Sequence, residues 1–170
     1  MRLSLHADYS FRVLIYLAAH PGETASTASI SRAYAISRHH LVRVVQTLED
    51  RGYVKVTAGR SGGVQLARDA GQIRLGQVVR DVEPNLALVE CFDPGTNTCP
   101  IIRACSLKAC LRDALAAFLD DLDRHTLADL ATGRQRENIA KALYQVAPAT
   151  KQATPTPGPK KRRLRAAARR

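Results

Sequence analysis

The chain has 170 residues, of which 45% are hydrophobic and 24% are charged. A chain of this length can bury one core, or a small module with an additional arm, but not the several cores of a multidomain enzyme. Lys and Arg number 26 against 15 Asp and Glu, a formal charge of +11, so the first partner to consider is a polyanion. Aromatic residues make up only 5% and Trp is absent, which argues against a single-strand binder that stacks bases on aromatic faces.

Much of the positive charge lies at the C-terminus. Residues 151–170 contain eight basic residues and no acid, which leaves a net charge of +3 for residues 1–150. The segment 135–170 is expected to be weakly structured and then disordered, because its proline-rich, basic end has too few apolar side chains to offset the entropy of ordering. Such a tail either adds salt-sensitive attraction to phosphates or is a dispensable extension.

Three stretches near the N-terminus show helical periodicity. Apolar residues recurring at threes and fours predict a helix over residues 8–19. Thr24 to Ser29 supply capping residues for a short second helix that runs through Tyr34. Ser37 is predicted to cap a third helix, which repeats the apolar pattern and ends at Gly52.

After the third helix the hydrophobic period changes to two. Val54 and Val56 alternate with polar residues, as do Val64 and Leu66 further along. The connection between them, Gly59-Arg-Ser-Gly-Gly63, combines glycines that permit positive φ with one arginine. The pattern predicts a hairpin with a basic tip.

Three helices followed by such a hairpin are the order of a winged helix-turn-helix, in which the third helix enters the major groove of DNA. A generic α+β domain has the same order, but the basic residues here lie where the DNA-binding geometry would use them. The predicted domain covers residues 1–67. Its DNA contacts are predicted to come from Ser37, Arg38, His39, His40 and Arg43 of the third helix and from Arg60 and Ser61 of the wing.

The second half of the chain is predicted to link this domain to a partner subunit. Residues 68–90 contain a connecting helix that Pro84 stops, and residues 91–105 form a loop rich in breakers. Residues 106–134 begin with an amphipathic helix of about five turns. Two-fold pairing of this helix would make a homodimer and place two third helices at the spacing of a palindromic operator. The fold class is therefore mainly α with a small β-hairpin wing.

Four cysteines, at positions 91, 99, 105 and 110, are clustered in this half of the chain. We find no secretory signal and no apolar run of about 20 residues that would cross a bilayer, so a cytoplasmic protein without a membrane partner is expected. Clustered thiols in that compartment indicate metal or redox chemistry. The spacing Cys-x7-Cys-x5-Cys-x4-Cys lacks the Cys-x2-Cys pairs of structural zinc sites, which favours an iron–sulfur cluster over zinc. Reactive or merely buried thiols are the third alternative.

Six segments carry a resemblance to a known family. They are Leu5-His-Ala-Asp-Tyr9 with Arg12, Ile36-Ser-Arg-His-His-Leu-Val42, Gly52-Tyr-Val54, Gly59-Arg-Ser-Gly-Gly63, Val79-Arg-Asp-Val-Glu-Pro84 and Cys105-Ser-Leu-Lys108. From Met1 to about Arg134 the chain resembles the winged-helix iron–sulfur transcription factors, which include nitric-oxide-sensing repressors and regulators of cluster assembly. The nitric-oxide-sensing branch is more similar, because Lys108 stands where the cluster-assembly regulators place a histidine ligand.

The resemblance implies the ligands. It assigns Cys91, Cys99 and Cys105 to the cluster, and Asp8 of the partner subunit to the remaining position of a 4Fe–4S cluster, which it favours over 2Fe–2S. Capping of the first helix is the alternative role of Asp8. Cys110 is extra, and a buried thiol is favoured over a fourth ligand because it lies beside the apolar seam of its helix.

The resulting hypothesis is a homodimeric repressor that binds operator DNA while its cluster is intact and releases it when nitric oxide reacts there. An iron–sulfur-status regulator and a zinc- or thiol-based redox regulator are alternatives that use the same DNA-binding domain. An electron-transfer or catalytic iron–sulfur protein would have no use for a recognition helix and a wing. No nucleophile–base pair or nucleotide loop is evident, so an enzyme is not expected.

Overall fold

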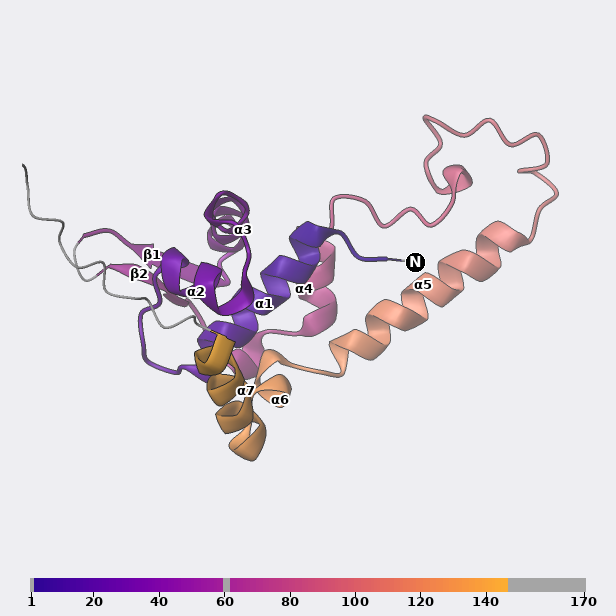
Figure 1. Cartoon of the computed structure of the whole chain (residues 1–170). Coiled ribbons are helices and arrows are strands. Elements are labelled where there is room, and N and C mark those ends of the chain that lie inside the picture. The colour runs from indigo at the N-terminus through magenta and orange to yellow at the C-terminus, as the bar shows by residue number, and fades with distance from the viewer. Residues whose placement is uncertain (1, 60–61, 147–170) are drawn as a thin grey trace, which may run out of the picture.

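The computed structural model describes residues 2–59 and 62–146. Figure 1 shows a helical body from which one long helix and a loop extend. In chain order the elements are α1 (Leu5–Ala19), α2 (Thr27–Tyr34), α3 (Arg38–Asp50), β1 (Val54–Thr57), β2 (Gly63–Leu66), the 3₁₀ turn η1 (Ala70–Gln72), α4 (Leu75–Val82), the 3₁₀ turn η2 (Glu90–Phe92), α5 (Leu107–Asp123), α6 (Leu127–Leu130) and α7 (Gly133–Val146).

Helix α1 is the centre of the body. Its buried face includes Val13 and Leu14, which are fully buried, and α2, α3, α4, α6, α7 and β2 all contact it. The helix begins at Leu5, three residues earlier than predicted, because Ser4 caps it by accepting a hydrogen bond from the Ala7 amide at 3.1 Å.

The predicted caps of the next two helices are confirmed. The Ser26 hydroxyl accepts from the Ser29 amide at 3.0 Å, and the Ser37 hydroxyl accepts from the His40 amide at 3.3 Å. Each bond satisfies a backbone donor that the first turn of a helix leaves without an intrahelical partner. The two caps set where α2 and α3 begin.

The hairpin is antiparallel, with Val54 opposite Leu66 and Val56 opposite Val64. Val64 also forms a bridge with Ala25, in the segment before α2, through two backbone hydrogen bonds of 2.8 and 2.9 Å. A Cβ atom at Gly63 would lie 2.6 Å from the Ala25 carbonyl oxygen, so only glycine allows this close approach. The base of the wing is thereby attached to the helical body.

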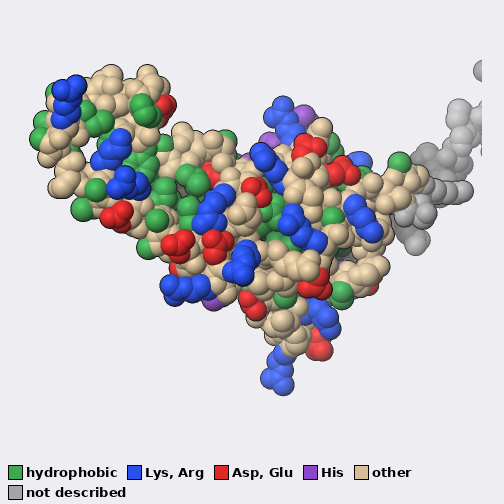
Figure 2. Space-filling view, turned by 180° about the vertical axis from the view of Figure 1, so that it is seen from behind, with side chains coloured by type: hydrophobic (Ala, Val, Ile, Leu, Met, Phe, Trp, Pro, Cys, Tyr) green, Lys and Arg blue, Asp and Glu red, His purple; other side chains and the backbone are tan. Residues whose placement is uncertain are grey.

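The C-terminal end of helix α5 packs tightly against α4. A Cβ atom at Gly76 of α4 would collide with the Leu119 carbonyl oxygen and the Asp123 carboxylate of α5. Arg80 of α4 lies 2.8 Å from the same carboxylate in an ion pair. The N-terminal part of α5 extends away from this contact together with the cysteine loop, and hydrophobic side chains gather over this arm (Figure 2).

The C-terminal part differs from the sequence-based expectation. Residues 135–146, expected to be weakly structured, belong to α7, which packs on α1 and α2. This packing buries Leu143, and a mainly polar helix gains its stability from such a contact rather than from its own sequence. Residues 147–170, where the basic tail is predicted, lie outside the described residues.

The predicted fold class is confirmed: the described chain is mainly helical, with a two-stranded wing and a long helix after the loop. None of the described helices combines the length and the apolar character needed to cross a membrane.

Tyr53 connects the base of the wing to α4. It is buried, and its hydroxyl donates to Asp81 Oδ2 at 2.6 Å, while Asp81 Oδ1 accepts from Gln77 at 3.0 Å. The Arg68 guanidinium lies over the Tyr53 ring, 4.4 Å from its centroid. Burial, together with the hydrogen bond to Asp81, raises the pKa of Tyr53 above its ordinary range.

Tyr53→Phe is expected to lower the free energy of unfolding by about 1–2 kcal/mol, because Asp81 loses its donor while the ring stays over Arg68. The native-state pKa is raised, so this contribution is complete below pH about 10, the ordinary tyrosine pKa, and is lost as pH rises further. Urea unfolding at pH 7 and at increasing alkaline pH measures both effects. Tyr144→Phe, at an exposed tyrosine of α7, is the control. Equal stability of Tyr53→Phe and the wild type at pH 7 would contradict the assignment.

Candidate nucleic-acid interface and cysteine site

The outer face of α3 is polar and basic. The helix buries Leu41, Val44, Val45 and Leu48 against the body. The opposite face exposes Arg38, His39, Val42, Arg43 and Gln46. Arginine, histidine and glutamine donors match base edges and phosphates, so this face has the chemistry of a recognition helix.

His40 and Arg43 lie on the side of α3 that faces α1. The His40 ring is 6.0 Å from the ring of Tyr9, and both α3 residues line a small cavity of about 130 Å³ with Leu5 and Tyr9 of α1. Both side chains are also exposed. The structure therefore places these two predicted DNA contacts next to the N-terminal turn of α1.

On its other side, α3 forms a groove of about 490 Å³ with the wing. Val42, Gln46 and Glu49 line it from α3, and Val56 lines it from β1. A Glu49 carboxylate oxygen accepts a hydrogen bond from the Val56 amide at 3.1 Å, which fixes the wing strand relative to α3. Val42 and Val56 are exposed, and neither is among the contact residues predicted from the sequence.

The predicted contacts of the wing tip, Arg60 and Ser61, lie outside the described residues. Their roles stay predictions.

The four thiols are free and occupy different positions along the arm. Cys91 lies in η2, Cys99 in the following loop and Cys105 just before α5, and all three are half-buried. Cys110 lies in the first turn of α5 and is exposed, which differs from the expected buried thiol. The reason is that this part of α5 extends beyond the body, where no described element covers it.

Side-chain hydrogen bonds organise the loop between Cys91 and Cys99. The Glu90 carboxylate accepts from the amide and, at 2.7 Å, from the hydroxyl of Thr98, and these two donors lower the pKa of Glu90. Asp93 accepts from the Gly95 amide at 2.9 Å and the Thr96 hydroxyl at 3.0 Å. These bonds close the loop between the first two cysteines.

The donor set fits an iron–sulfur cluster, because three half-buried free thiols lie along one irregular loop. Within residues 2–59 and 62–146, no three Cys, His, Asp or Glu side chains are gathered at a point where they could hold a metal ion. The structure therefore supplies the ligand chemistry in one segment without assembling Cys91, Cys99 and Cys105 into a site.

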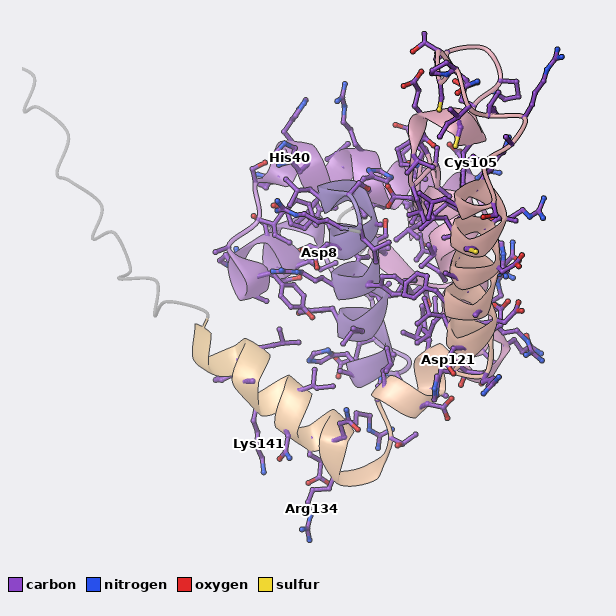
Figure 3. All side chains as sticks on the ribbon, turned by 90° about the vertical axis from the view of Figure 1, so that its right-hand side faces the viewer. Asp8, His40, Cys105, Asp121, Arg134 and Lys141 are labelled. Carbon is purple, nitrogen blue, oxygen red and sulfur yellow. The ribbon has the colours of Figure 1, made fainter. Side chains whose placement is uncertain are left out.

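Asp8 forms an ion pair within α1. Its carboxylate lies 2.9 and 3.2 Å from two nitrogens of Arg12, one turn further along the helix. Ser4 rather than Asp8 caps α1, so the predicted capping role of Asp8 is wrong, although Asp8 lies in the first turn, where a carboxylate suits the helix dipole. Asp8 is half-buried, and Figure 3 shows it on α1 in the body, whereas Cys105 lies at the end of the arm.

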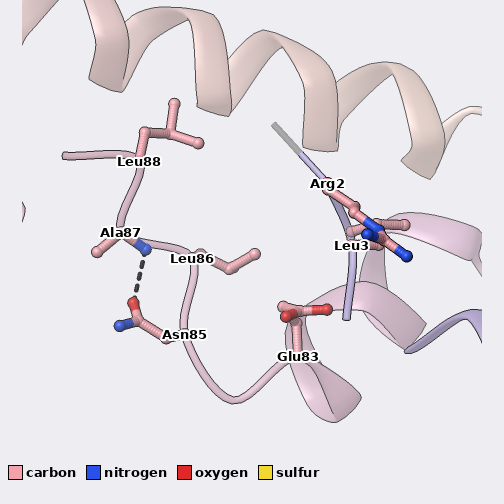
Figure 4. Close-up of a pocket in the computed structure, with 7 residues that line it drawn as sticks. All are labelled: Arg2, Leu3, Glu83, Asn85, Leu86, Ala87 and Leu88. Carbon is pink, nitrogen blue, oxygen red and sulfur yellow. Dashed lines mark hydrogen bonds between the residues drawn. The ribbon is translucent and has the colours of Figure 1, made fainter. Parts of the chain in front are cut away.

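Glu83 connects α1 to the segment that leads from α4 to the cysteine loop. It directly follows α4, and one carboxylate oxygen accepts from the Ser4 amide at 3.1 Å and from the Ser4 hydroxyl at 3.0 Å. Beside it, a pocket of about 160 Å³ separates the N-terminal segment from the loop, and Arg2, Leu3 and Leu86 contribute to its lining (Figure 4). No local pattern predicts this contact, because Ser4 and Glu83 are 79 residues apart along the chain.

Residues 3–133 match the model of a protein family described as "Rrf2: Iron-dependent Transcriptional regulator". The chain belongs to the Rrf2 family of transcriptional regulators. It is 44% identical to the HTH-type transcriptional regulator NsrR of Bacillus subtilis (strain 168) over 144 residues, which cover 84% of this chain and 97% of that relative. It is 40% identical to the regulator of the same name from Halalkalibacterium halodurans over 149 residues, 87% of this chain and all of the relative. The resemblance found in the sequence is thus confirmed, and these relatives are named as regulators rather than enzymes.

Solved structures of regulators show the same fold. The CymR global cysteine regulator of B. subtilis is 30% identical, with a TM-score of 0.59 over 77% of this chain and 96% of that one. The IscR of T. potens is 25% identical, with a TM-score of 0.61 over 76% of this chain and 85% of that one.

Glu90→Ala is expected to increase amide hydrogen exchange at Thr98 several-fold in the cluster-free protein, because the carboxylate that holds this amide is removed. Exchange resolved by residue with NMR measures the effect. Asp93→Ala is the matched control, since it should accelerate exchange at Gly95 instead. Unchanged exchange at Thr98 in Glu90→Ala would show that Glu90 does not close the loop.

Proposed function

We propose that the chain is a homodimeric repressor that binds a palindromic operator while it carries an iron–sulfur cluster and releases it when nitric oxide reacts there. Family membership supports transcriptional regulation, and the names of the 40–44% identical relatives support the more specific role. Operator binding is assigned to α3 and the wing. Ser37, Arg38, His39, His40 and Arg43 would contact the major groove, and Arg60 with Ser61 would contact the backbone or minor groove.

Cys91, Cys99 and Cys105 are the proposed ligands, with Asp8 of a second copy as the candidate for the last position of a 4Fe–4S cluster. Such a cluster supplies iron that can bind the small neutral effector nitric oxide. Asp8 would have to exchange its ion pair with Arg12 for this role, and the pair is about two-fifths exposed, so the exchange costs little. Cys110 is left outside the ligand set.

The observation that carries the proposal is the hydrogen bonding of Glu83 to Ser4. Glu83 begins the segment that leads from α4 to the cysteine loop, Ser4 caps α1, and α3 packs against α1. A change in the loop would therefore act on the N-terminus of the helix that supports the recognition helix. Coupling of this kind requires that the loop with its ligand favours one arrangement of the DNA-binding elements over another.

Dimerisation is assigned to the extended part of α5. Leu107 and Ile101, at this end of the arm, are 58% and 61% exposed, and Leu111, Leu115 and Phe118 further along are only half-buried. A second copy would cover this apolar surface.

A thiol- or zinc-based redox regulator with the same DNA-binding surface is the second candidate. The similarity to the CymR cysteine regulator and the exposure of Cys110 favour it. An iron–sulfur-status regulator similar to IscR is a further alternative within the family.

The deciding experiment uses full-length protein purified without oxygen and the promoter of its own gene. DNA binding is measured before and after a few equivalents of nitric oxide, with iron and sulfide assayed on the same sample. Binding that requires the cluster and is abolished by nitric oxide is the expected result. Equal binding by the iron-free protein, with no response to nitric oxide, would overturn the sensor assignment and leave only the DNA-binding part.

Substitution of the ligands gives the second test. Cys91→Ser, Cys99→Ser and Cys105→Ser are each expected to lose most of the bound iron and sulfide and to weaken operator binding at least tenfold, whereas Cys110→Ser retains both. Loss of iron from Cys110→Ser, with retention in one of the other three, would contradict the ligand assignment.

Glu83→Gln tests the coupling. The amide oxygen can still accept both hydrogen bonds from Ser4 but carries no charge, and charge-assisted bonds are roughly twice as strong as neutral ones. The variant is expected to load iron normally while the ratio of operator affinities with and without the cluster falls several-fold. Glu137→Gln, at an exposed position on α7, is the matched control. If the ratio of operator affinities in Glu83→Gln equals that of the wild type, the contact between Glu83 and Ser4 does not couple the cluster to DNA binding.

A further inference from the structure

Two exposed valines lie on the proposed DNA-binding surface. Val42 of α3 is 53% exposed and Val56 of β1 is 43% exposed, and both line the groove between the recognition helix and the wing. Val45 and Val64, which also line this groove, are buried in the core. The groove therefore has an apolar floor that continues outward to Val42 and Val56.

The fold does not account for Val42. The core contacts of α3 come from the opposite face of the helix, where Leu41, Val44, Val45 and Leu48 are buried. Valine is also a weaker helix former than alanine at an exposed position, because its branched side chain loses rotamer freedom. Neither packing nor helix propensity therefore favours valine at position 42.

The neighbours of Val42 on the outer face of α3 all carry hydrogen-bond donors. They are Arg38, His39, Arg43 and Gln46, and each is exposed. The major groove presents acceptors that such donors recognise, and it presents one apolar group, the C5 methyl of thymine. Among these five exposed side chains of α3, Val42 is the apolar one, and phosphate or a guanine edge offers it nothing to contact.

We propose that Val42 recognises the methyl group of one thymine in each half-site of the operator. This inference rests on the proposed function, since it needs α3 in the major groove. It goes further by naming thymine as a base that α3 recognises. Val56 lies on the wing strand, where the Glu49 carboxylate fixes its amide. No base contact is assigned to Val56.

Replacement of thymine by deoxyuridine removes only the C5 methyl and so isolates this contact. Full-length protein purified without oxygen selects its operator from a pool of random duplexes, and each thymine is then replaced singly at one fixed salt concentration. For the wild type, deoxyuridine at one position of each half-site is expected to weaken binding about fourfold, the equivalent of one buried methyl group.

Two protein variants, each combined with the deoxyuridine replacement, test whether Val42 makes this contact. In Val42→Ala the same replacement should have no further effect, because the contact is already lost, and thermal unfolding should show a stability at least equal to the wild type. Val56→Ala is the matched control: an exposed valine of the same groove is truncated, and the fourfold sensitivity to deoxyuridine is retained.

The outcomes separate this inference from the function on which it rests. An operator that is selected but insensitive to deoxyuridine at every thymine would overturn the role of Val42 alone. Sensitivity that persists in Val42→Ala would have the same consequence. Failure to select any duplex would overturn the proposed function, and the inference with it.

Discussion

The burial of α1 is the constraint on which the other elements depend. Its apolar face, with Ala7, Val13 and Leu14 fully buried, is the surface against which α2, α3, α4, α6, α7 and β2 are placed. The packing on α1 therefore does much to set the position of α3, the proposed recognition helix, which also contacts α2 and β1. Protein interiors are close-packed, so this helix cannot move without a response from the elements around it.

The local elements were predictable because their signals are local. Ser26 and Ser37 cap α2 and α3 as expected, since a cap involves only the first turn of its own helix. The hairpin followed from a period of two over a few residues. Helix α7 was not predicted, because its stability comes from a contact with α1 and α2, more than a hundred residues earlier in the chain.

The candidate site was predictable as a list of residues and not as an arrangement. Cysteine spacing located the loop, but the bonds of Glu90 and Asp93 that organise it depend on side-chain geometry. Asp8 was considered as a cap or a ligand. Its ion pair with Arg12 is a contact between successive turns of α1, and Ser4 takes the cap position. The helical period predicts that Val42 lies on the outer face of α3, but it predicts no contact for it, because the groove beside Val42 is formed with the wing.

The C-terminal end of α4 contacts the base of the wing and the start of α1, the helix against which α3 packs. Asp81 accepts from Tyr53 at the base of the wing, and Glu83, two residues later, accepts from Ser4 at the start of α1. The segment that follows leads to the cysteine loop, which begins at Cys91. On the proposed function, a displacement of this loop would strain two hydrogen bonds together. One joins Asp81 to Tyr53 at the base of the wing, and the other joins Glu83 to Ser4 at the start of α1, the helix that supports α3. In both bonds the acceptor is a partly buried carboxylate. Breaking either bond therefore leaves a charge that is incompletely solvated, which costs free energy. The loop can therefore bias the wing and the recognition helix together without contact with DNA.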